Sequence, residues 1–190
     1  MRSVFGSMLV LALVALLQGC EAVLLGTAAG TTAVVATDRR TTGIFVEDQN
    51  IELKVRSRIN ERFRDQVNIS VTSYNRMVLL TGEAPNESLK TEIGSVAKSV
   101  SNVRDVVNEI QIAAPSSYGA QSNDAYITSK VKARLLDTKA ALANNVKVVT
   151  ESGTVYLMGL VTHEEATQAA EVASTTGGVR RVVKVFEYVN

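Results

Sequence analysis

Between residues 47 and 113, apolar side chains follow two different periods. Ile51, Val55 and Ile59 recur every four residues, which predicts a helix with one apolar face. Further along, apolar and polar residues alternate in two short runs, which predicts the two strands of a hairpin. The apolar positions of these runs are Ile69, Val71, Val78 and Leu80. A second helix from residue 86 and a closing strand over residues 103–112 complete the order helix, strand, strand, helix, strand.

Residues 124–190 repeat this order. The segment from Asp48 to Arg58 matches the segment from Asp124 to Arg134 at an offset of 76 residues. Two later pairs of segments keep the same order: Val78–Gly82 with Val155–Gly159, and Val103–Val107 with Val179–Val183. A repeat of this length indicates one structural unit used twice. We therefore predict an α+β fold of two tandem αββαβ domains, at 47–113 and 124–190, each a small three-stranded mixed sheet packed by two helices.

Polar residues mark the expected ends of these elements. We expect Asp48 and Asp124 to cap the first helix of each unit, and Asn86 to open the second helix of the first unit. Thr162 and Glu165 have the spacing of a capping box at the start of the corresponding helix. The expected hairpin turns are residues 74–76 and 151–153, and the expected linker between the units is residues 114–123.

The first 19 residues have a different pattern, in which a short positive head precedes a nearly unbroken apolar run. This is the layout of a secretory signal peptide. The run of about 14 residues would be roughly 21 Å long as a helix, whereas a membrane span needs about 20 residues. A longer anchor reaching Ala36 is the alternative, and Glu21 disfavours it because a carboxylate within a span is costly. We expect residues 1–19 to be removed as a lipoprotein signal peptide.

Leu17-Gln18-Gly19-Cys20 resembles the lipobox of bacterial lipoproteins. The resemblance implies that Cys20, the only cysteine of the chain, becomes the mature N-terminus and carries diacylglycerol and acyl chains such as palmitate. Two or three acyl chains anchor a protein durably, whereas one anchors it marginally. Residues 20–46, rich in Gly, Ala and Thr, are expected to form this lipidated end and a flexible tether.

Composition restricts the classes of function. Without Arg2, the mature chain keeps 19 of the 20 basic residues against 19 acidic ones, and this neutrality disfavours nucleic acid as a partner. Because the chain has one histidine and one cysteine, we expect no metal site, no cofactor and no catalytic triad. His163 is expected to be an exposed residue at a helix start. We do not expect the protein to be an enzyme.

The first helices of the two units differ on the side away from the apolar face. Asn50 and Asn60 of the first unit correspond to Tyr126 and Leu136 of the second. At 100° per residue, the second helix has one outward stripe with lysines on its flanks. The stripe and its flanks comprise Tyr126, Ser129, Lys130, Lys132, Ala133 and Leu136. This mixture favours contact with an anionic lipid surface. The alternative is that the stripe packs against the first domain.

Paired αββαβ units, each with an apolar strand ending in Gly and a closing strand of the type Val-x-x-Val, resemble the BON domain family. Two such units behind a lipobox and the tether Thr37-Asp-Arg-Arg-Thr-Thr-Gly43 are similar to its dual-domain outer-membrane lipoproteins. The resemblance implies a protein that is lipid-anchored to the outer membrane, faces the periplasm and binds anionic phospholipid such as phosphatidylglycerol. It further implies a role in envelope integrity and enrichment at the division site. It points to the helix that carries Tyr126.

A second function hypothesis remains open. The protein could instead be a periplasmic scaffold that binds outer-membrane assembly or cell-wall remodelling machinery through its domain surfaces. Leu53 on the first helix of the first domain favours a structural or protein-binding role for that domain. In bacterial lipoproteins an Asp directly after the lipidated cysteine commonly signals retention in the inner membrane. Glu21 stands at that position here, and the outer membrane is the expected destination.

Overall fold

The computed structural model describes residues 38–113 and 119–190, with side chains described up to 113 and from 123 onward. The expected signal peptide, Cys20 and most of the expected tether lie outside these residues. Among the described residues, no helix has the length and apolar character needed to cross a membrane.

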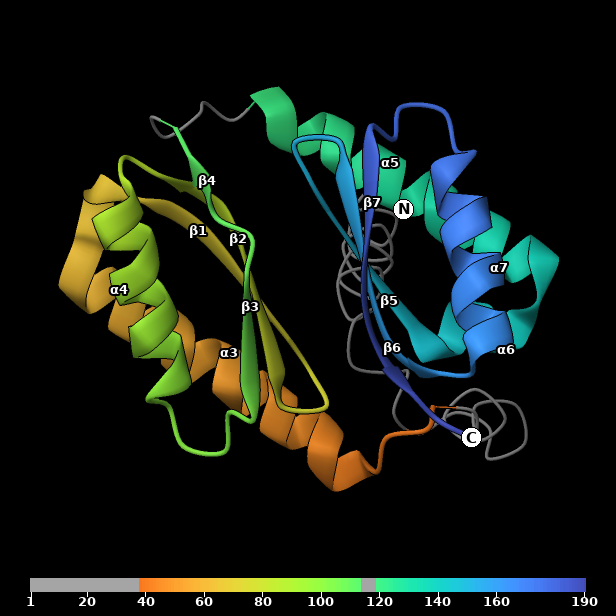
Figure 1. Cartoon of the computed structure of the whole chain (residues 1–190), viewed down its shortest axis with the longest axis horizontal. Helices are drawn as coiled ribbons and strands as arrows, with labels where there is room; N and C mark the ends of the chain where they lie inside the picture. The colour runs from red at the N-terminus through yellow and green to blue at the C-terminus, as the bar shows by residue number, and fades with distance from the viewer. Residues whose placement is uncertain (1–37, 114–118) are drawn as a thin grey trace, which may run out of the picture. The chain divides into compact units, whose positions relative to one another are not determined.

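The first domain is a mixed sheet covered by two helices (Figure 1). Strand β2 lies in the middle of the sheet, antiparallel to β1 and parallel to β3 and β4. In chain order the elements are α3 (Thr42–Phe63), a short 3-10 turn (Arg64–Gln66), β1 (Asn68–Tyr74), β2 (Met77–Ala84), α4 (Glu87–Lys98), β3 (Asp105–Asn108) and β4 (Gln111–Ile112).

The second domain repeats this arrangement, with strand order β5-β6-β7 and β6 in the middle. Its elements are α5 (Gly119–Thr138), α6 (Ala140–Asn145), β5 (Val146–Glu151), β6 (Thr154–Val161), α7 (His163–Ser174) and β7 (Arg181–Tyr188). The prediction of an α+β fold with two tandem αββαβ domains is confirmed. Two elements were not predicted, the short helix α6 and the separate strand β4.

Local chemistry explains both additional elements. The closing strand of the first domain is interrupted because the side-chain carbonyl of Asn108 accepts the Ile110 N–H at 3.3 Å, which ends the regular ladder before β4. Helix α6 has the sequence Ala-Ala-Leu-Ala-Asn-Asn, whose first four residues favour helix. Its Leu142 is fully buried in the core of the second domain. The helix therefore closes the end of that core.

Each domain has a core between its helices and one face of its sheet. The predicted apolar stripes of the first helices are buried as expected, with Ile51, Val55 and Ile59 in one core and Ile127, Val131 and Leu135 in the other. The strand residues at every second position, 78 and 80 in β2 and 155 and 157 in β6, lie in the same cores. The helical and strand periods of the sequence therefore predict correctly which side chains face the core.

The opposite faces of the two sheets form a third apolar cluster, which joins the domains. Its buried members are Tyr74, Leu79, Tyr156, Met158 and Val185. Strands β2 and β6 are consequently buried on both faces, which explains why they read as nearly continuous apolar runs rather than strict alternations. The domains thus pack sheet against sheet, and each domain covers apolar surface that the other would expose.

A glycine at the same place in each middle strand permits close pairing with the preceding strand. A Cβ at Gly82 would lie 2.0 Å from the Asn68 carbonyl oxygen, and Gly82 has φ 106°. A Cβ at Gly159 would lie 2.4 Å from the Asn145 carbonyl oxygen. Both distances are far inside van der Waals contact, so the glycine that ends the apolar strand in each repeat is required by the fold.

The prediction that Asp48 and Asp124 cap their helices is wrong. Helix α3 begins at Thr42 with Thr41 as its N-cap, and α5 begins at Gly119, so both aspartates lie inside helices. The helices therefore extend into the expected tether (20–46) and the expected linker (114–123). The sequence does not show this because Gly, Ser and Thr in those segments have low helix propensity and favour a loop.

The two aspartates instead hold the hairpin turns of their own domains. The Asp48 carboxylate accepts the N–H groups of Asn75 and Arg76 at 2.8 and 2.7 Å. Asp124 accepts those of Ser152 and Gly153 at 2.7 and 2.9 Å. All four turn residues have positive φ, between 47° and 71°. Because three of them are not glycine, the carboxylate offsets the strain of a turn that these side chains disfavour.

Candidate functional site

The outward stripe of α5 lies on the surface of the second domain. Tyr126 is 63% exposed and Leu136 is 57% exposed, and Ser129 and Ala133 between them are also exposed. The stripe does not pack against the first domain, because the domains meet through their sheets. The stripe is therefore a free surface of the second domain, with an apolar side chain at each end.

The two flanking lysines have different surroundings. The Lys130 ammonium lies 4.5 Å from the centroid of the Tyr126 ring and donates a hydrogen bond to the Gly177 carbonyl. The cation–π contact joins a positive charge to the aromatic group on the same surface. Lys132 is exposed, and no ion pair involves it among the described residues. Both cations therefore lie beside the stripe, one held in place and one free to move.

Several contacts fix α5 against the end of α7. The Arg134 guanidinium donates to the Val172 carbonyl at 3.0 Å and to the Thr176 hydroxyl at 2.7 Å. Gly178 has φ 100°, and a Cβ there would lie 3.2 Å from the Ile127 side chain. This close packing gives the stripe a rigid support. Sequence reasoning did not find the participation of the loop around Gly177, whose only signal is the Gly177-Gly178 pair.

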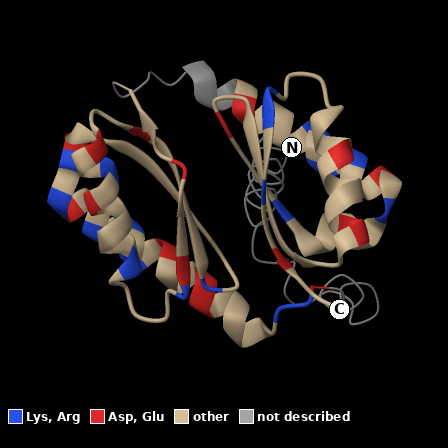
Figure 2. Ribbon diagram, in the orientation of Figure 1, with Lys and Arg blue, Asp and Glu red and all other residues tan. Residues whose placement is uncertain are grey.

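The matching surface of α3 in the first domain has a different composition. Asn50 and Asn60 are exposed where α5 has Tyr126 and Leu136, and Leu53 is 64% exposed where α5 has Ser129. Figure 2 shows that acidic and basic residues are mixed over the helices of both domains. Charge alone therefore does not distinguish the two helices.

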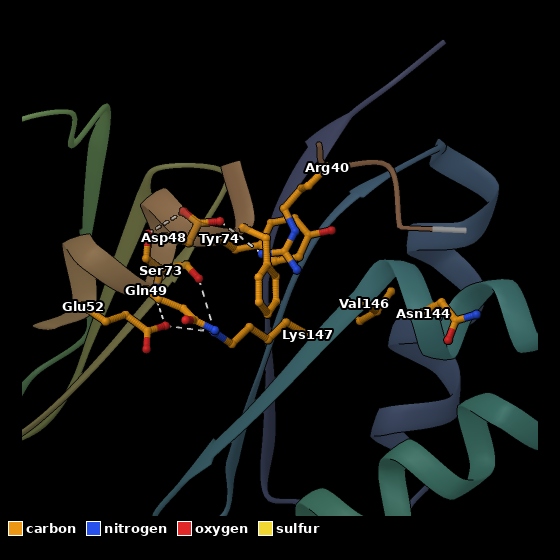
Figure 3. A pocket seen from close by; sticks show the side chains of 10 residues that line it. Arg40, Asp48, Gln49, Glu52, Ser73, Tyr74, Asn144, Val146 and Lys147 are labelled. Atoms are coloured by element: carbon orange, nitrogen blue, oxygen red, sulfur yellow. Dashed lines mark hydrogen bonds and ion pairs between the residues drawn. The ribbon is translucent and has the colours of Figure 1, made fainter. Parts of the chain in front are cut away.

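A pocket of about 230 Å³ lies between α3 and β5 (Figure 3). Its charged groups are paired with one another: Lys147 Nζ is 2.9 Å from Glu52, and Arg40 Nη1 is 3.0 Å from Asp48. Its remaining lining residues are Phe45, Gln49, Ser73, Tyr74, Asn144 and Val146. The pocket has balanced charge, and its cations and carboxylates already satisfy one another.

Groups able to perform chemistry are widely separated. His163 is exposed at the first residue of α7, and its ring stacks on Tyr188 with centroids 4.1 Å apart. Glu165 completes the predicted capping box with Thr162. In the part of the chain that the structure describes, no three His, Cys, Asp or Glu side chains are grouped as metal ligands. We find no arrangement of nucleophile, base and orienting group there.

Two adjacent arginines form contacts that sequence reasoning missed. Arg39 and Arg40 were assigned to the flexible tether, yet Arg39 bonds to Glu165 of the second domain and Arg40 to Asp48 of the first. The hydrogen bond from Arg39 lowers the pKa of the Glu165 carboxyl, and burial opposes this effect. A run of three charged residues, Asp38-Arg39-Arg40, in a segment otherwise poor in charge was the only signal for this role.

Both domains of the chain match a known protein family. The BON domain family model matches residues 47–114 and 123–190. The chain is 38% identical over 92% of its length to the outer membrane lipoprotein DolP of Haemophilus influenzae, covering 91% of that protein. It is 35% identical to a 21 kDa hemolysin of Actinobacillus pleuropneumoniae, covering 80% of this chain and 79% of that one. It is 30% identical to the osmotically-inducible protein Y of Escherichia coli, covering 74% and 72%.

Proposed function

The chain belongs to the BON domain family, and from that premise we propose that it is a non-catalytic outer-membrane lipoprotein that binds anionic phospholipid through α5. Cys20 would carry the lipid anchor, and the folded domains would face the periplasm. The similarity to an outer membrane lipoprotein over nearly the whole chain supports this location. We further propose that the protein supports envelope integrity and is enriched at the division site.

The observation that carries the proposal is the exposed stripe of α5. Tyr126 and Leu136 offer an aromatic group with a polar end and an aliphatic group, and Lys130 and Lys132 lie beside them. Tyrosine is suited to the membrane interface, and each lysine near an anionic surface adds about 1 kcal/mol of attraction. Small residues between the two apolar ends let the helix approach the headgroups closely.

A contact of this size is weak by itself. Two lysines and two partly inserted side chains supply only a few kcal/mol, roughly the scale of millimolar affinity. Lipid chains on Cys20 would already hold the protein at the membrane, so that α5 meets the surface at a high effective concentration. The anchor would provide attachment, and α5 would respond to the lipid composition.

Vesicle binding by the unlipidated mature chain tests the proposal. We expect binding to vesicles that contain phosphatidylglycerol and not to vesicles of phosphatidylcholine alone. Tyr126→Glu should weaken binding at least about tenfold, because it removes the aromatic anchor and places a carboxylate against anionic headgroups. Asn50→Glu is the matched control, since it makes a similar charge change at the corresponding position of α3. Equal binding by the two variants would contradict the proposal.

The scaffold hypothesis is favoured by one observation, the exposure of Leu53 and Val46 on α3. Crosslinking in intact cells discriminates between the hypotheses. A scaffold requires a crosslinked protein partner that is lost on Leu53→Glu and retained on Tyr126→Glu. Loss of partners on Tyr126→Glu alone would favour lipid binding through α5.

A further inference from the structure

The segment Asp38–Arg40 joins the two domains through adjacent side chains. Arg39 contacts the second domain, while Arg40 contacts the first. The residues they reach are far apart in the sequence, at positions 165 and 48. Arg40 also stacks on Tyr74 of the apolar cluster between the sheets, so the segment adds polar contacts at the edge of that cluster.

Arg40 is the more deeply buried of the two arginines, with 8% of its side chain exposed. Its Nη1 lies 3.0 Å from Asp48 Oδ2, and its guanidinium carbon lies 3.9 Å from the centroid of the Tyr74 ring. Asp38 pairs with the same guanidinium at 2.8 Å. A buried arginine with two carboxylates and a stacked ring has few alternative positions. Figure 3 shows Arg40 with Tyr74 and Asp48 at the edge of the pocket.

Arg39 binds the second domain at the start of α7. Its Nη1 and Nη2 donate to the two carboxylate oxygens of Glu165 at 2.6 and 3.0 Å, which is a bidentate pair. Its Nη1 also donates to the Leu160 carbonyl at 2.7 Å, at the end of β6. Three hydrogen bonds from one guanidinium fix both the position and the direction of the chain at residue 39.

Both acceptor carboxylates already serve the fold. Asp48 holds the hairpin turn of the first domain, and Glu165 belongs to the capping box of α7. They are therefore rigid acceptors that exist before the arginines reach them. Such preorganised sites bind a flexible segment with little additional ordering of the domains.

We propose that Asp38–Arg40 is a strap that fastens the two domains together and fixes the point at which the N-terminal tether meets them. Fixing this point limits the orientations that α5 can take toward the membrane, a consequence that rests on the proposed lipid binding. The strap itself does not depend on that function. It acts as a positioning device between the anchor and the lipid-binding surface.

Trypsin tests the strap directly, because it cleaves after arginine and requires an extended, undocked segment. In the lipidated mature protein on vesicles, Glu165→Gln should raise the rate of cleavage after Arg39 about tenfold, since cleavage follows the population of the open segment. Glutamine preserves the capping box, so α7 remains intact. Glu164→Gln, the exposed neighbour in the same helical turn, is the control. Equal cleavage rates in the two variants would overturn the strap.

Amine labelling of Lys132 on vesicles containing phosphatidylglycerol tests the positioning role. Glu165→Gln should increase the labelling about two- to threefold in the lipidated protein, because a tether freed from the second domain and held only by Arg40 on the first lowers the effective concentration of α5 at the surface. Vesicle binding by the unlipidated protein should be the same in parent and variant. Unchanged labelling after confirmed release of the strap would overturn the positioning role. If vesicles do not protect Lys132 in the parent protein, the proposed lipid binding fails instead.

Discussion

The two domains agree in their interiors and differ on their outer helices. Asp48 and Asp124 accept the same pair of turn N–H groups, and Gly82 and Gly159 permit the same close strand pairing. On the outside, α3 and α5 also share their cations, because Lys54 and Arg56 occupy the positions of Lys130 and Lys132. Their difference lies in the neutral positions, where Asn50, Leu53 and Asn60 of α3 correspond to Tyr126, Ser129 and Leu136 of α5.

This comparison separates the requirements of folding from those of the surface. Positions that close a core or hold a turn repeat because both units have the same backbone to build. Exposed positions carry no such requirement and can specialise. The aromatic and aliphatic ends of the α5 stripe are therefore the features most specific to one domain, and the following variants are designed to break or sharpen the comparison.

The largest effect is expected from Gly82→Ala. The new Cβ would meet the Asn68 carbonyl oxygen, and the backbone at φ 106° disfavours any side chain. We expect a loss of about 5 kcal/mol or more in the free energy of unfolding, because backbone clash and backbone strain add. Gly159→Ala should cost less, because only the steric clash applies there. Gly177→Ala is the control, since nothing lies within 4 Å of its Cβ. Denaturant unfolding measures all three, and a Gly159 variant less stable than the Gly82 variant would reverse this order.

The second effect distinguishes the two turn-holding aspartates. Asp124→Ala should lower stability by about 1–3 kcal/mol, because the N–H groups of Ser152 and Gly153 lose their acceptor. Asp48→Ala should cost about 3–5 kcal/mol, because it also leaves the buried Arg40 without this partner and removes the acceptor of the Ser73 hydroxyl. Thermal unfolding checks both values. Equal losses would show that the Arg40 contact adds nothing to the first domain.

A transplant of the stripe sharpens the comparison of the helices. In a Tyr126→Glu background, Asn50→Tyr with Asn60→Leu should restore binding to phosphatidylglycerol vesicles to within a few-fold of the parent, because α3 already carries the two cations. Co-sedimentation of the unlipidated chain measures this. Asn50→Ser with Asn60→Ser is the matched control. No recovery would mean that the support around Gly177, and not the stripe alone, makes the surface functional.

The smallest effect concerns Glu151, which lies where the first domain has Tyr74. Burial raises the pKa of the Glu151 carboxyl, and the nearby Asp124 and Glu83 carboxylates raise it further, while the hydrogen bond from Thr81 opposes this. The folded protein therefore binds this proton more tightly than the unfolded chain does. The stability that this tighter proton binding gives the folded protein is fully present below the ordinary pKa of glutamate. It is lost as pH rises through the pKa of Glu151 in the folded protein.

We therefore expect Glu151→Gln to raise the melting temperature by about 1–2 °C at neutral pH and to have little effect in acid. Melting curves of variant and parent at several pH values measure the difference. Glu164→Gln, at an exposed site, should show no such dependence. A variant less stable than the parent at neutral pH would mean that the hydrogen bond with Thr81 outweighs the repulsion.

Much of each domain could be predicted because its elements are encoded over short distances. Four-residue spacing of Ile127, Val131 and Leu135 identified the buried face of α5, and the same count placed Tyr126 and Leu136 outside. The capping box at Thr162 was also readable, since its two partners are three residues apart. Helix α6 was missed because six residues rich in alanine are too few to establish a period.

What the sequence by itself determined about this protein is the repeated unit, its order of elements and the direction in which each helix faces. Backbone geometry converts local spacing directly into these features. Only the tertiary structure decided that the sheets pack against each other, that Asp48 and Asp124 hold turns rather than cap helices, and that Arg39 and Arg40 reach opposite domains. Those contacts join residues separated by up to 126 positions, and no local period records which distant groups the folded chain brings together.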